Sequence, residues 1–146
     1  CGGTLRLMVQ DLRRDRDVVL AAVQKSGGQE LQFAAQELRR DRSFVMEVLR
    51  QHGSALQYAG QELRGDGEVV LAAVKSSGSQ ALHFASQELR RNRAFMLEVI
   101  EEDGLALQAA ASELRRERPF ALAAVRRCGL ALQFVGQALR GDKQVV

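Results

Sequence analysis

The chain has 146 residues, a net charge of +3, a hydrophobic fraction of 46% and a charged fraction of 27%. These values are typical of a folded globular protein and exclude a disordered chain, and the length suffices to bury a core. No apolar run approaches the roughly 20 residues that a membrane-spanning helix needs.

A repeat of 25 or 26 residues runs through the chain. The dipeptide Leu-Arg occurs six times at intervals of 26, 25, 26, 25 and 25 residues, beginning at Leu12, Leu38, Leu63, Leu89, Leu114 and Leu139. Glycine recurs in step with it, at positions 2, 27, 53, 78, 104 and 129. Self-similarity at such a period indicates stacked structural repeats.

The first segment of each repeat is an apolar run, such as VVLAAV at 18–23 or FVMEVL at 44–49. A glycine follows each run, where a left-handed residue ends many helices, and Pro119 falls in a first turn. We therefore predict short, buried helices. Their expected N-caps are Asp15, Asp41, Asp66, Asn92 and Glu117.

The second segment, such as LQYAGQELR at 56–64, places apolar residues at i, i+2, i+3 and i+7. With Leu56, Ala59 and Leu63 as the buried stripe, it predicts an amphipathic helix with one exposed face. Helices this short are marginal alone, so stacking must stabilise them. Small residues that permit close helix approach recur at one position: Ala35, Gly60, Ser86, Ala111 and Gly136.

Neighbouring repeats differ, which gives a double unit of 51 residues. Glu47 and Glu98 occur in alternate first helices, where Ala21, Ala72 and Ala123 stand in the others. The glycines at 27, 78 and 129 form one set, and those at 2, 53 and 104 form the other. The expected fold is an all-α solenoid of about six helix pairs, one array over residues 1–146. We expect this array to be a segment of a longer one, because it starts and stops inside a repeat.

The pattern D-x-x-V-V-L-A-A-V-x-x-x-G-x-A-L-Q-F-A-x-x-E-L-R-x-D resembles the repeat called domain of unknown function 4116. The resemblance covers the chain from Gly2 to Val146. It implies a helical array of a kind common in unicellular eukaryotes, algae among them, and in some intracellular bacteria. It implies no established chemistry and no site residues. An algal chloroplast complex is the location that this resemblance suggests.

Eighteen of the 21 basic residues are arginines, and 14 of these lie at the turn that precedes a first helix. The Leu-Arg arginines define a candidate basic edge: Arg13, Arg39, Arg64, Arg90, Arg115 and Arg140. Such an edge suits the phosphates of a nucleic acid. Eleven acidic residues share the edge with 15 basic ones. We therefore favour the interpretation that the arginines form ion pairs between repeats.

A second candidate site is the amide row, one polar residue per repeat, at Gln32, Gln57, His83, Gln108 and Gln133. It predicts either a protein-binding stripe on the exposed face or a ladder that joins adjacent helices. The next residue is aromatic in Phe33, Tyr58, Phe84 and Phe134. These rings are expected in the core rather than as stacking platforms, because Ala109 interrupts the series.

No catalytic, metal or cofactor site is predicted. His52 and His83 occupy non-equivalent positions, and Cys1 and Cys128 lie in the first and last repeats, so no zinc set converges. The expected function is a non-catalytic scaffold or structural subunit that binds other proteins. The alternative is sequence-tolerant nucleic-acid binding along the basic edge, with peripheral membrane contact third. Substitution of the edge arginines should abolish nucleic-acid binding, whereas a scaffold should depend more on the amide row.

Overall fold

The computed structural model describes residues 11–134, and every regular element in that range is a helix. Within this range each longer α-helix is followed by a 3-10 helix, and after each of the first four of these comes a short α-helix. The longer helices are α1 (Arg16–Ser26), α3 (Arg42–Leu49), α5 (Gly67–Ser77), α7 (Arg93–Glu102) and α9 (Arg118–Arg127). The all-α helical repeat is therefore confirmed.

The remaining elements are shorter. The 3-10 helices are η3 (Gly28–Phe33), η4 (Gly53–Tyr58), η5 (Ser79–Phe84), η6 (Gly104–Ala109) and η7 (Gly129–Phe134). The short α-helices are α2 (Gln36–Arg40), α4 (Gln61–Arg64), α6 (Gln87–Arg91) and α8 (Ser112–Arg116). A 3-10 turn, η2 (Leu12–Arg14), occupies the short-helix position before α1.

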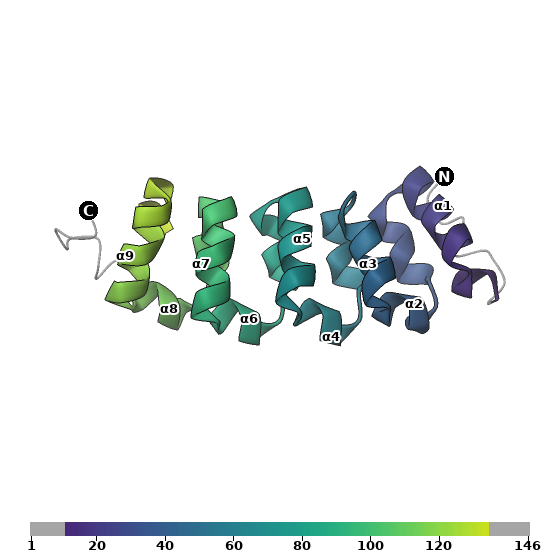
Figure 1. Cartoon of the computed structure of the whole chain (residues 1–146), viewed down its shortest axis with the longest axis horizontal. Coiled ribbons are helices and arrows are strands. Elements are labelled where there is room, and N and C mark those ends of the chain that lie inside the picture. Colours follow the sequence, from purple (N-terminus) through teal and green to yellow (C-terminus); the bar gives the residue numbers. More distant parts are fainter. Residues whose placement is uncertain (1–10, 135–146) are drawn as a thin grey trace. The chain divides into compact units, whose positions relative to one another are not determined.

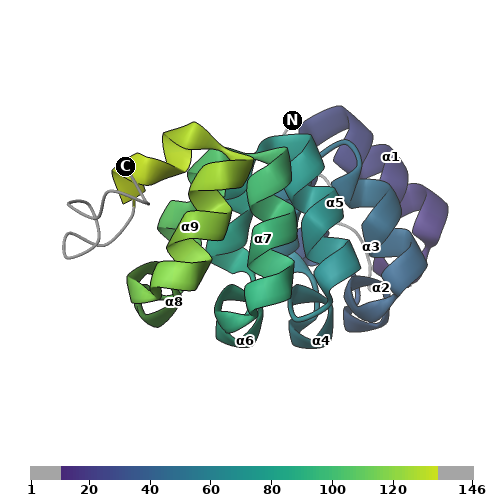
Figure 2. The same ribbon diagram turned by 60° about the vertical axis from the view of Figure 1, so that its left-hand side comes forward.

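The chain forms two compact units, divided between Phe84 and Ala85. In the first unit, α1, α3 and α5 lie side by side, and α2 and α4 lie at one end of them (Figures 1 and 2). In the second unit, α7 and α9 lie side by side, with α6 and α8 at one end of them. Within each unit, a longer helix packs on that of the next repeat. One continuous array over residues 1–146 stays a prediction.

The longer helices begin at the predicted caps. Asp15 and Asp66 each accept hydrogen bonds from two backbone amides of the first turn, and Asp41 and Asn92 accept one each. These bonds satisfy amides that have no partner inside the helix. Glu117 stands at the cap position of α9 without such a bond, and Pro119 lies in the first turn as predicted.

The recurrent glycines occupy two kinds of position in the structure. Gly27 and Gly78 have φ angles of 94° and 78°, so they are the left-handed C-caps that the sequence predicts. Gly53 and Gly104 instead open the 3-10 helices η4 and η6. Gly129, grouped with Gly27 and Gly78 from the sequence, behaves like Gly53, because it opens η7 after an extended Cys128. The alternation of the 51-residue unit therefore does not continue into this last copy.

The sequence predicts one continuous second helix in each repeat, and this prediction is wrong. Ala34 and Ala35 are extended, with ψ angles of 152° and 150°, and they separate η3 from α2. Equivalent breaks separate the 3-10 helix from the short helix in the later repeats. The predicted stripe is nevertheless buried, since Leu56, Ala59 and Leu63 are at most 7% exposed. The burial prediction is thus confirmed, although two short helices rather than one present these side chains.

Glycine allows the backbones of neighbouring repeats to approach closely. Gly53 is buried, and a β-carbon placed on it would lie 2.9 Å from the Cβ of Ser77 and closer still to the carbonyl oxygen of Ala73. A β-carbon on Gly28 would lie 2.9 Å from those of Ala55 and His52 in the next repeat. Close packing between repeats therefore requires glycine at these two positions, because its side chain is a single hydrogen atom.

We predict that Gly53→Ala lowers the free energy of unfolding by about 2 kcal/mol, because the new methyl group meets the backbone of α5. Urea denaturation followed by circular dichroism measures this change. Gly129→Ala is the matched control, since no described atom lies within 4 Å of its added carbon. The control substitution should change the free energy of unfolding by less than about 0.5 kcal/mol. Equal losses in the two variants would contradict the role assigned to close packing.

Candidate functional site

The arginines of the candidate basic edge lie at the ends of the short helices, where a cation complements the helix dipole. Arg39 and Arg64 belong to the last turns of α2 and α4, and Arg90 and Arg115 to those of α6 and α8. Arg13 lies in η2. Arg140 lies outside the described residues.

The backbone of these arginines joins consecutive repeats. The Arg13 carbonyl accepts a hydrogen bond of 2.9 Å from the amide of Ala35, one repeat later. The Arg39 carbonyl accepts a bond of 2.7 Å from the amide of Gly60, and in the second unit Arg90 and Ala111 form the same bond at 3.0 Å. The donors are the small residues that the sequence assigns to close approach. These residues lie in the extended segments between a 3-10 helix and a short α-helix. Their amides therefore have no partner within a helix and can donate to the preceding repeat.

The side chains of the same arginines are partly buried, at the Nε atom. The Nε atoms of Arg13, Arg39, Arg64, Arg90 and Arg115 are buried without a hydrogen-bond partner, although each residue is half-exposed. Arg39 and Arg64 form no ion pair with any described residue, so their terminal Nη groups reach solvent. The same holds for Arg90 and Arg115. The favoured interpretation, that ion pairs occupy these arginines, is therefore wrong for these four residues.

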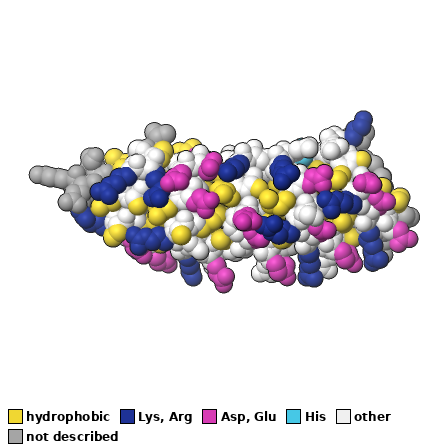
Figure 3. Space-filling model, in the orientation of Figure 1, with side chains coloured by type: hydrophobic (Ala, Val, Ile, Leu, Met, Phe, Trp, Pro, Cys, Tyr) yellow, Lys and Arg dark blue, Asp and Glu magenta, His cyan; other side chains and the backbone are white. Residues whose placement is uncertain are grey.

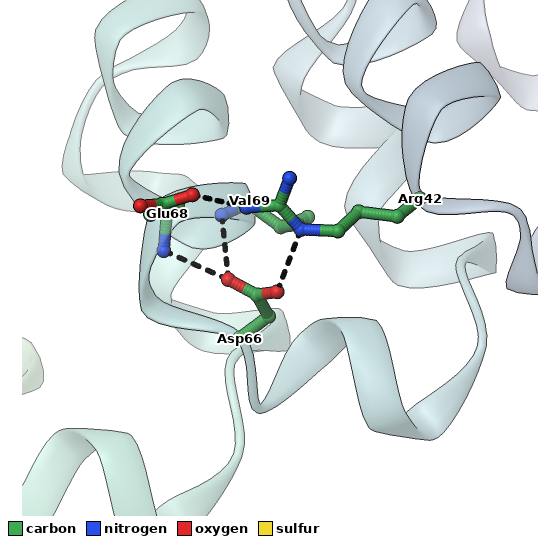
Figure 4. A network of polar contacts seen from close by, with 4 residues as sticks. All are labelled: Arg42, Asp66, Glu68 and Val69. Atoms are coloured by element: carbon green, nitrogen blue, oxygen red, sulfur yellow. Dashed lines mark hydrogen bonds and ion pairs between the residues drawn. The ribbon is translucent and has the colours of Figure 1, made fainter.

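Ion pairs between repeats do form, but other arginines form them. The Nη2 of Arg16 lies 2.9 Å from the Oε2 of Glu47, and its guanidinium lies 5.5 Å from the centre of the Phe44 ring. Arg42 lies 3.0 Å from Asp66 and also contacts Glu68 (Figure 4). Arg16 and Arg42 are the first residues of α1 and α3, so these pairs join the first turn of one longer helix to the next longer helix.

The second unit repeats this arrangement. Arg93, the first residue of α7, lies 3.7 Å from Glu117 at the start of α9. Arg127 and Glu101 pair at the other ends of the same two helices, at 2.5 Å. On the face of the molecule in Figure 3, acidic and basic side chains are interspersed. The charges that hold repeats together are thus distinct from the candidate basic edge.

The ion pair of Asp66 shifts the ionisation of its carboxyl group. Burial raises the pKa of Asp66, but hydrogen bonds from Arg42 and from the amides of Val69 and Glu68 outweigh it, so the net pKa is lowered (Figure 4). The pKa of Asp41 is lowered by the amide of Phe44 first. Both shifts arise from helix capping and packing, and they mark no acid–base catalyst.

The amide row is exposed where its side chains are described. Gln32, Gln57, His83 and Gln108 are all exposed, as the sequence predicts. The Nε2 groups of Gln32 and Gln57 donate to the carbonyl oxygens of Gln29 and Ser54, at 3.0 and 3.3 Å. These bonds stay within one 3-10 helix, so they fix the side chains without joining adjacent helices. The side chain of Gln133 lies outside the described part.

The amide row and the basic edge meet in one cleft of the first unit. The cleft has a volume of about 390 Å³, and its lining residues are Arg13, Arg14, Gln32, Phe33, Ala34, Ala35, Gln36, Glu37 and Arg39. The sequence treats the two sets as separate surfaces. They converge at the break formed by Ala34 and Ala35, which separates η3 from α2 and itself lines the cleft.

Phe33 also lines this cleft, which the sequence does not predict. Phe33, Tyr58 and Phe84 are half-exposed rather than buried in the core. The Glu37 carboxylate in the cleft lies 4.0 Å from Arg14. The cleft therefore combines three arginines, two of which belong to the basic edge, with two amide side chains, an aromatic ring and a single acidic group. This set of groups suits recognition of a polar, extended ligand.

Metal binding and membrane insertion each require a feature that would be recognisable within residues 11–134. In that range no three His, Cys, Asp or Glu side chains are grouped as a metal ion would require. No helix in the same range is both long enough and apolar enough to cross a bilayer.

We predict that Asp66→Asn lowers the melting temperature by about 3 °C at pH 7, because the amide keeps the cap but loses the ion pair with Arg42. The lowered folded-state pKa means that this stabilisation exists above the ordinary pKa of about 4 and disappears as the pH falls through the folded value. Thermal melts should therefore show the difference closing near pH 2. Asp15→Asn is the control, since Asp15 caps α1 without an ion pair to a described residue. A difference in melting temperature that persists at pH 2 would contradict the assignment of this stabilisation to the ion pair of Asp66 with Arg42.

Comparison with known proteins gives one match. The sequence model of the family described as "Domain of unknown function (DUF4116)" matches residues 15–64, 41–90 and 66–115. Each match begins at the cap of a longer helix and spans two repeats, and together they cover more than half of the chain. No curated protein and no solved structure matches the chain. The chain belongs to the DUF4116 family.

Proposed function

We propose that this protein is a non-catalytic helical-repeat scaffold that holds other proteins within a larger assembly. The observation that carries the proposal is the convergence of Gln32 with Arg13 and Arg39 in one cleft. An exposed amide side chain offers the same donor and acceptor as a peptide group. A cleft that combines amides with guanidinium groups is therefore complementary to a polypeptide backbone and its polar side chains.

Repetition extends this complementarity. Gln57 and Arg64 repeat the positions of Gln32 and Arg39 one repeat later, in the same unit. A ligand that bridges both repeats makes the same contacts twice, so each additional repeat adds affinity without a new kind of contact. A protein partner with an extended segment meets this requirement.

Sequence-tolerant nucleic-acid binding is the second candidate. It is favoured by the solvent-accessible Nη groups of Arg39 and Arg64 and by the half-exposed rings of Phe33 and Tyr58, on which bases stack in other proteins. The cleft counts against it, because Glu37 beside Arg39 repels a chain that carries a charge at every phosphate. The protein partner is therefore the stronger candidate.

We expect a defined set of proteins to co-purify with the native full-length protein and to survive nuclease treatment. Gln32→Ala with Gln57→Ala should lose most of this set, because both amides line the proposed contact. Arg50→Gln is the control, since Arg50 is exposed and lies at the opposite end of α3 from the ion-paired Arg42. Mass spectrometry of the co-purified proteins gives the readout. Loss of the whole set on nuclease treatment would instead assign the surface to nucleic acid.

A further inference from the structure

The buried Nε atoms of the basic edge recur at five equivalent positions, at Arg13, Arg39, Arg64, Arg90 and Arg115. A buried donor without a partner is destabilising, and natural proteins contain few of them. One such atom would need no explanation, but the same atom in five consecutive repeats indicates a property of the repeat itself. The repeat therefore accepts the cost of this buried Nε at the same position in five copies, where the guanidinium charge also complements a helix C-terminus.

Burial of the Nε atom fixes the orientation of the rest of the guanidinium group. The covered Nε restricts rotation of the side chain, whereas the terminal Nη groups of Arg39 and Arg64 reach solvent and pair with no described residue. A planar group held in this way loses little entropy when an anion binds to its two outer nitrogens. Carboxylates match that geometry, since they accept two parallel hydrogen bonds. The arginines are therefore pre-organised to bind carboxylate groups.

The spacing of the repeats restricts the ligand further. Neighbouring packed helices lie about 10 Å apart, and a peptide in the extended polyproline II conformation advances about 3.1 Å per residue and presents every third side chain on the same face. Three residues of extended peptide thus span one repeat. A peptide with an acidic side chain at every third position would place successive carboxylates at Arg39 and Arg64. Its intervening neutral residues would lie beside Glu37 and Glu62, which are both exposed.

We propose that the basic edge of the first unit binds an extended peptide segment with an acidic residue at every third position. Arg39 and Arg64 bind its carboxylates, and Gln32 and Gln57 bind its backbone. The proposal rests on the proposed function, to which it adds the chemistry of the partner. It differs from general attraction of anions because it requires a particular spacing of the acidic residues.

The experiment measures binding of fluorescein-labelled 12-residue peptides to the full chain by fluorescence anisotropy. One peptide repeats Glu-Ser-Ser, a second contains the same residues with the glutamates clustered, and a third replaces glutamate by glutamine. A single-stranded oligouridylate of equal charge is measured alongside. We expect the evenly spaced peptide to bind at least tenfold more tightly than the clustered and neutral peptides and the RNA.

Variants locate the site. Arg39→Gln with Arg64→Gln should weaken binding of the spaced peptide at least tenfold, and Arg50→Gln should leave it within about twofold, as expected for a charge outside the site. Arg39→Lys with Arg64→Lys keeps the charge and the aliphatic stem but loses the planar guanidinium, so we expect an intermediate loss. Circular dichroism confirms that each variant is folded before binding is measured.

Each alternative outcome identifies what fails. Equal binding of the spaced and clustered peptides would overturn the three-residue spacing. Equal binding of the neutral peptide, unchanged in the Arg39→Gln, Arg64→Gln variant, would overturn the acidic partner and leave the protein scaffold standing. Tighter binding of the RNA, lost in the same variant, would overturn both proposals. Binding of none of these ligands would overturn the acidic peptide, while the co-purification experiment decides the scaffold independently.

Discussion

The hydrogen bond between an arginine carbonyl and a backbone amide of the next repeat is the constraint on which the structure depends. In the first unit it joins Arg13 to Ala35 and Arg39 to Gly60. Its donor is available only because the chain is extended just before the short helix, so the bond and the break in the helix require each other. It also holds Arg13, Arg39 and Arg90 at the junctions between repeats.

Two sets of arginines in the repeat differ in their contacts. Those at the first position of a longer helix, such as Arg16 and Arg42, form ion pairs with acidic residues of the next repeat and contribute to packing. The Leu-Arg arginines, such as Arg39 and Arg64, complement a helix C-terminus but direct their Nη groups to solvent. The count of 15 basic and 11 acidic residues along the edge does not show this division. Arg39 and Arg64 therefore have outer guanidinium nitrogens that a ligand could reach.

The cleft explains how short repeats create a surface larger than any single helix provides. The 3-10 helix supplies Gln32 and the aromatic ring, the short α-helix supplies Gln36 and Arg39, and the preceding repeat supplies Arg13 and Arg14. No single repeat contains the whole set, so the cleft forms only where two repeats stack. This dependence is consistent with a binding role for the array, since a substitution at the packing glycines would disturb the surface as well as the fold.

The sequence alone determines the period, the helical class, the caps at Asp15, Asp41, Asp66 and Asn92, and the buried stripe of Leu56, Ala59 and Leu63. These features follow from local chemistry and from the spacing of apolar residues, which one chain displays directly. Tertiary structure decides the break before Gly60, the pairing of Arg42 with Asp66 and the convergence of Gln32 with Arg39. Each depends on a partner about 25 residues or more away or on a turn of the backbone, and the periodicity of side chains within one segment contains no information about either.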